Sequence, residues 1–109
     1  MKIKRLKASI IKDTRGDKTI QILLATNFGN FVSSSPNGKS RGRYEAQPWK
    51  GKIENDIEVV NNYPIYDIEI KKFDDLQIIE DIFMKMVGAN TMIAIEYAFL
   101  KALANKEDK

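Results

Sequence analysis

The sequence has no cysteine and no histidine among its 109 residues. Without cysteine there is no disulfide framework, no thiol nucleophile and no thiolate metal site. Without histidine there is no imidazole, a side chain widely used as a general base and as a metal ligand. These two absences exclude most hydrolase and zinc chemistries. A self-contained active site would have to be built from Lys, Asp, Glu, Ser or Tyr side chains.

Long apolar runs are also lacking. No stretch approaches the roughly 20 apolar residues that are needed to cross a bilayer. The charged opening M-K-I-K-R-L-K has neither the apolar core nor the cleavage site of a signal peptide. We therefore expect a cytoplasmic protein with no membrane partner. A hydrophobic content of 43% with 30% charged residues is typical of a globular chain rather than a disordered one, and the length suits a single domain over residues 1–109.

The sequence has little excess of charge. Eighteen Lys and Arg against fifteen Asp and Glu give a net charge of +3, which by itself does not predict binding to nucleic acid. The charges are unevenly distributed along the chain. Residues 1–52 hold most of the basic side chains, and the charged side chains of residues 53–85 are mostly acidic.

Alternating apolar residues in the first third of the chain predict three strands. Leu6, Ala8 and Ile10 share one register, and the same period of two recurs after a turn that contains Gly16. We place the strands at about residues 2–12, 19–26 and 30–34. Because the turns between them are short, the strands are expected to form an antiparallel meander.

The remainder of the chain predicts three to four helices, at about residues 53–62, 74–86 and 90–104, so the expected fold class is α+β. Residues 63–72 alternate like a strand but are short and isolated, and their structure is left open. The last predicted helix is apolar on nearly every side. Such a helix lies either at the centre of the domain or against a partner.

The loop at residues 35–52 combines glycine, hydroxyl and basic side chains. Its candidate ligand-binding residues are Gly38, Lys39, Ser40, Arg41, Gly42 and Arg43. A phosphate-binding P-loop is rejected because that motif requires a glycine where Ser33 stands. The basic residues, together with Tyr44 and Trp49, are compatible with phosphate or RNA binding, and equally with a solvated connection.

The order of several motifs resembles the N-terminal domain of the enolase family along nearly the whole chain. Residues 3–22, I-K-R-L-K-A-S-I-I-K-D-T-R-G-D-K-T-I-Q-I, are similar to the enolase opening. Residues 36–46, P-N-G-K-S-R-G-R-Y-E-A, are similar to the family's P-S-G-A-S-T-G-x-Y-E-A, and residues 88–90, G-A-N, open the last helix as in enolase. A weaker match lies at residues 58–62, E-V-V-N-N.

This resemblance implies a role for one serine. In the enolase family the loop closes over the active site, and its second serine, which corresponds to Ser40, binds a catalytic magnesium ion. Here Lys39 and Arg41 flank that serine in place of small residues, and Asn37 replaces the first serine. The other catalytic groups of enolase lie in a barrel of about 250 residues. One hydroxyl does not hold Mg²⁺ without carboxylates or phosphates, so we expect no cofactor for the chain alone and Mg²⁺ only in a complex.

Three functions remain open on this reading. The first is a free-standing, non-catalytic binding or assembly module that acts through self-association or a protein partner, with Arg15, Phe99 and Leu103 as interface candidates. The second is a subunit of a split enolase-type enzyme, a phosphopyruvate hydratase, that supplies the Ser40 loop in trans. The third is phosphate or RNA binding through the basic residues at 39–52.

Overall fold

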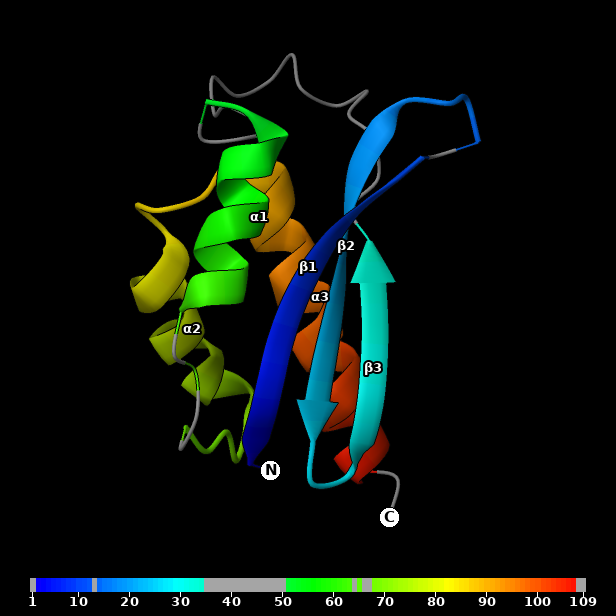
Figure 1. Ribbon diagram of the computed structural model, residues 1–109. Coiled ribbons are helices and arrows are strands. Elements are labelled where there is room, and N and C mark those ends of the chain that lie inside the picture. Colours follow the sequence, from blue (N-terminus) through cyan, green and yellow to red (C-terminus); the bar gives the residue numbers. More distant parts are fainter. Residues whose placement is uncertain (1, 13, 35–50, 64, 66–67, 108–109) are drawn as a thin grey trace.

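The first part of the chain forms one antiparallel sheet. The computed structural model describes residues 2–12, 14–34, 51–63, 65 and 68–107. The strands are β1 (Ile3–Lys12), β2 (Lys18–Thr26) and β3 (Gly29–Ser34), in the spatial order β1-β2-β3 (Figure 1). They are followed by α1 (Ile53–Asn62), the 3₁₀ turn η2 (Phe73–Asp75), α2 (Leu76–Phe83) and α3 (Ala89–Glu107). The predicted α+β class, a meander followed by helices, is confirmed.

Alternation along the strands separates a core face of the sheet from an outer face. Leu6 pairs with Leu24 and Ala8 with Ile22, and all four side chains are buried. Lys7, which lies between them on β1, is exposed on the outer face. The helices cover the core face, with α1 against β1 and α3 behind β2 and β3 (Figure 1). The period of two in the sequence therefore sets which face of the sheet receives the helices.

The turn between β2 and β3 depends on one threonine and one glycine. Thr26 Oγ1 accepts a hydrogen bond from the Phe28 N–H and donates one to the Gly29 carbonyl, both at 3.0 Å. Gly29 has a φ of +137°, a conformation that residues with a side chain rarely adopt. The short turn places β3 directly beside β2.

Helix α1 is attached to the edge of the sheet by an asparagine. Asn61 Oδ1 accepts from the Ala8 N–H at 2.7 Å, and Asn61 Nδ2 donates to the Ala8 carbonyl at 3.1 Å. Since β1 is an outer strand, its backbone groups on that side need partners other than β2. The amide of Asn61 thus replaces one residue of a fourth strand.

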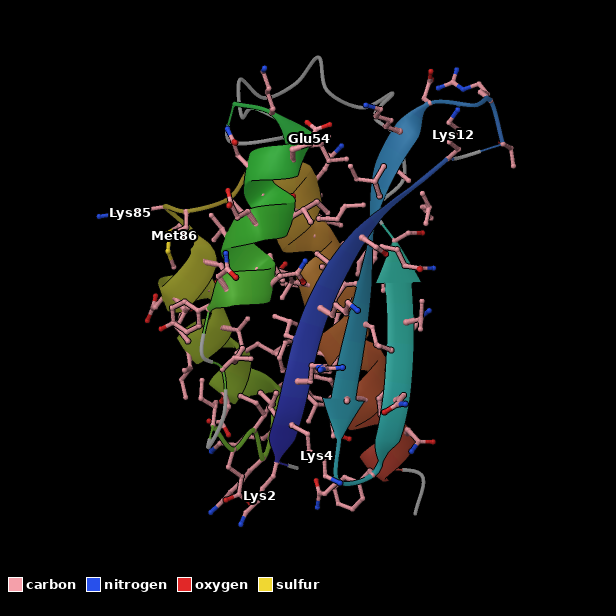
Figure 2. The ribbon with its side chains drawn as sticks, in the orientation of Figure 1. Lys2, Lys4, Lys12, Glu54, Lys85 and Met86 are labelled. Atoms are coloured by element: carbon pink, nitrogen blue, oxygen red, sulfur yellow. The ribbon has the colours of Figure 1, made fainter. Side chains whose placement is uncertain are left out.

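At the other end of α1, Glu54 lies toward the hairpin of β1 and β2 (Figure 2). Lys18 Nζ, at the start of β2, is 3.5 Å from Glu54 Oε2. Both side chains are more than half exposed, so this ion pair contributes little to stability.

The second predicted helix is shorter in the structure. A 3₁₀ turn at Phe73–Asp75 precedes α2, which ends at Phe83 instead of residue 86. After Phe83 the chain turns, and the Met86 and Val87 N–H groups both bond to the Phe83 carbonyl. Bonds to the same carbonyl tighten the last turn and end the helix there.

The ambiguous segment 63–72 contains no regular strand among its described residues. It makes one isolated antiparallel bridge, between Lys2 and Glu69, and the Ile3 N–H bonds to the Ile68 carbonyl at 3.2 Å. Ile65 and Ile70 are buried in the core. The alternation in this segment therefore reflects two apolar side chains that anchor an irregular connection.

Helix α3 is buried along most of its length but not on every side. Its fully buried apolar residues are Ala94, Ile95, Ala98, Phe99, Ala102 and Leu103. Ile93, Tyr97 and Leu100, at helical spacing on another face, are exposed. On its exposed side, Lys101 Nζ donates to the Val32 carbonyl of β3 at 2.7 Å. No helix in the described ranges has both the length and the apolar character required to cross a membrane.

Candidate functional site

The predicted ligand-binding loop lies outside the described residues, which resume at Gly51. The assignments to Gly38, Lys39, Ser40, Arg41, Gly42 and Arg43, and the magnesium role of Ser40, therefore remain predictions. The same applies to phosphate or RNA binding through residues 39–52.

The three interface candidates occupy different environments. Arg15 is exposed in the turn between β1 and β2, and its role in an interface stays a prediction. Phe99 and Leu103 expose none of their surface, because the helical period of α3 directs them into the core. Their role in an interface also stays a prediction. The surface that α3 presents is formed instead by Ile93, Tyr97 and Leu100, which we call the α3 stripe.

Beside the α3 stripe is a hollow of about 340 Å³ between η2–α2 and α3, which we call the α2–α3 groove. It is lined by Phe73, Asp74, Leu76, Gln77, Glu80, Glu96 and Leu100. Leu100 belongs to both the stripe and the groove. The two features are therefore continuous on one surface of the molecule.

The groove brings two carboxyl groups together from different helices. Glu80 lies on α2 and Glu96 on α3, and both are partly buried. Burial raises the pKa of Glu96 to about 7, and a hydrogen bond to Glu80 and repulsion by its charge act in the same direction. Near neutral pH the Glu96 side chain is therefore partly protonated.

Two large apolar side chains on this surface are nearly half exposed. Phe73 is 48% exposed at one side of the groove, and Tyr97 is 47% exposed on the α3 stripe. Single apolar side chains on a surface are ordinary, whereas neighbouring ones that border a hollow are typical of a contact surface.

The starts of α1 and α3 are held together by a fully buried carboxylate. Asp56 Oδ2 accepts from Thr91 Oγ1 at 2.6 Å and from the Gly88 N–H at 2.9 Å. Because the carboxylate accepts hydrogen bonds from a backbone N–H and from a hydroxyl, the free-energy cost of burying it is offset. This contact fixes the first turn of α3 against α1, close to the point where the described chain resumes after residue 50.

Sequence reasoning named neither acidic site. Glu96 is the only acidic residue between positions 91 and 104, a lone carboxylate on an apolar helix, and that isolation was the available signal. Asp56 gave no such signal, because acidic residues are common in its neighbourhood. No group of three or more Asp or Glu side chains is placed to hold a metal ion in the part of the chain that the structure describes.

Comparison with known proteins gives a distant similarity to enolases. An enolase of Mycoplasma mobile is 25% identical over 125 residues, which cover 95% of this chain and 28% of the relative. Enolase B of Dictyostelium discoideum is 25% identical over 122 residues, covering 96% of this chain and 28% of the relative. No protein-family model matches the chain.

The chain therefore spans little more than a quarter of the curated relatives it matches. Its three-stranded sheet followed by helices has the layout of the enolase N-terminal domain. The layout and the extent of the match are consistent with a segment related to the N-terminal part of an enolase.

Proposed function

We propose that this chain is an enolase N-terminal-like module, non-catalytic by itself, that acts by docking onto another polypeptide through the α3 stripe and the α2–α3 groove. The observation that supports this most directly is the continuity of Tyr97, Leu100 and Phe73 on one surface. Burial of such side chains against a partner contributes about 25 cal/mol for each Å² of apolar surface removed from water.

The similarity to enolases supports docking in a second way. Most of each relative lies outside the region that this chain matches. In those proteins the corresponding segment is joined to a larger polypeptide. A module of the same layout is then suited to contact further protein, supplied either by another copy or by a different chain.

The experiment is sedimentation equilibrium over a wide concentration range, with the wild-type protein and the double variant Tyr97→Glu/Leu100→Glu. We expect concentration-dependent association that the double variant weakens at least about tenfold, because charge is placed in the contact. The matched control is Phe28→Glu, which alters an equally exposed aromatic side chain on the β2–β3 turn.

If the wild type stays monomeric, a second experiment uses affinity capture. The wild type, the double variant and Phe28→Glu are each used as bait. Capture that is lost with Tyr97→Glu/Leu100→Glu and retained with Phe28→Glu supports docking. A monomeric wild type that captures the same proteins as both variants refutes docking.

The second candidate is a subunit of a split enolase-type enzyme. The similarity of residues 36–46 to the enolase loop favours it, and the docking surface would then receive a separate barrel chain. Ser40 would supply one oxygen ligand to Mg²⁺ in that complex. The test is phosphopyruvate hydratase activity after mixing with a barrel-only polypeptide, with Ser40→Ala compared with Ser35→Ala. Activity that is absent, or equal in both variants, refutes this role.

A further inference from the structure

We propose that the α2–α3 groove receives a Lys or Arg side chain of the docking partner, with the aliphatic stem against Leu76 and Leu100 and the cationic head between Glu80 and Glu96. This inference rests on the proposed docking function, because it names the chemistry that the same surface recognises. The partner is thereby specified as a polypeptide that presents a basic side chain at the centre of its contact.

The size and lining of the groove suit a long side chain better than a compact ion. Its volume of about 340 Å³ is equivalent to the space of about ten water molecules in the liquid. Leu76 and Leu100 provide apolar walls, and Phe73 stands 48% exposed beside them. Lys and Arg side chains bury their methylene stems along such walls and keep their charged heads at polar groups.

The charge of the groove is of one sign. The titratable groups facing it are Asp74 and Glu80 from η2–α2 and Glu96 from α3, and its described lining contains no basic residue. Lys101, the residue after Leu100 on α3, carries a positive charge, but its ammonium group donates a hydrogen bond to the Val32 carbonyl of β3. A cation from another molecule is therefore the complementary group.

The protonation of the pair supports the same conclusion. Burial raises the pKa of Glu96 to about 7, and the hydrogen bond to Glu80 and the repulsion by its charge act in the same direction. A cation placed beside Glu80 and Glu96 favours the ionised form of Glu96 and releases its proton. Binding of a cation is then coupled to pH, and it becomes tighter as pH rises through about 7.

A small probe tests this chemistry without the partner. The probe is n-butylguanidinium, which carries a cation on an aliphatic stem, and its control is n-butylurea, which has a similar shape and no charge. Both are titrated into the 109-residue protein, and the NMR shifts of the Leu76 and Leu100 methyl groups are followed. We expect saturable shifts with the cation alone, and affinity that is about tenfold higher at about pH 8.5 than at about pH 5.5.

Two variants locate the binding. Glu80→Gln/Glu96→Gln should abolish the shifts at both pH values, because the counter-charges are removed while the side-chain size is kept. Glu58→Gln, which alters an exposed carboxylate on α1, should leave them unchanged. Equal shifts with n-butylurea, unchanged binding by the double variant, or no saturable shift with the wild type overturns the proposal. The comparison of the two probes uses the wild type alone and does not depend on the folding of a variant.

The outcome is independent of the docking experiment. If the cation binds and Tyr97→Glu/Leu100→Glu has no effect on association or capture, the groove chemistry stands and the docking function fails. If docking depends on Tyr97 and Leu100 but the cation does not bind, the docking function stands and the role of Glu80 and Glu96 fails.

Discussion

The bond between Asp56 and Thr91 offers the sharpest test of how this small chain holds its helices together. Thr91 Oγ1 donates to Asp56 Oδ2 at 2.6 Å, and both residues are fully buried. A hydrogen bond to a charged group contributes about 1.5–3 kcal/mol to stability. Thr91→Val removes the hydroxyl and leaves the carboxylate with one fewer donor. We expect the free energy of unfolding to fall by about 2 kcal/mol.

Asp56→Asn keeps the size of the side chain and removes its charge. Its bond from the Gly88 N–H, at 2.9 Å, then becomes a bond between neutral groups. We expect a loss of about 1–3 kcal/mol. Each loss is a large part of the roughly 5–15 kcal/mol that stabilises a typical domain.

The double variant Asp56→Asn/Thr91→Val separates the bond from its surroundings. Because the two residues are in contact, the losses should not add, and urea unfolding of the four proteins should give a coupling energy of about 1 kcal/mol or more. Thr14→Val, at an exposed turn position, controls for the change of threonine to valine. A coupling below about 0.3 kcal/mol would refute the reasoning that this bond joins α1 to α3.

Three further predictions concern stability. Because the pKa of Glu96 is raised to about 7 from its ordinary 4.5, the folded state binds more protons than the unfolded state between these values. Stability should therefore fall as pH rises through this window, by about 1 kcal/mol after allowance for solvent screening. Glu96→Gln should flatten this dependence in urea unfolding, and an unchanged slope would contradict it. Asn61→Ala should lower stability by about 1–2 kcal/mol and speed hydrogen exchange at the middle of β1, whereas Asn62→Ala at the exposed neighbouring position should not. Phe83→Ala, at a fully buried position, should cost about 3–5 kcal/mol by thermal unfolding, and Met84→Ala, at a side chain that is 59% exposed, less than about 1 kcal/mol.

Local sequence pattern predicted the sheet well because the pattern and the structure have the same period. Leu6 and Ala8 alternate with charged neighbours, and each faces the core as the alternation requires. The helices were located for a similar reason. Their ends were less well predicted, as the stop of α2 at Phe83 shows, because it depends on how the following turn bonds to the Phe83 carbonyl.

The described site could not be predicted in the same way, because it is made by tertiary packing. Glu80 and Glu96 are 16 positions apart and meet only when α2 packs beside α3. Asp56 and Thr91 are farther apart still. Composition showed that α3 is apolar without showing which of its faces is covered, and the structure places Phe99 on the buried face.

The bond from Lys101 to the Val32 carbonyl has a consequence for how the free edge of the sheet meets other molecules. Strand β3 is an outer strand, and an outer strand is a template on which further strands can add and grow into fibres. A lysine ammonium seated on that edge makes strand addition unfavourable, since an incoming strand would have to displace the charge. If the chain docks as proposed, its contacts are thereby directed to side chains on the helices, where they are finite and reversible, and away from open-ended polymerisation of the backbone.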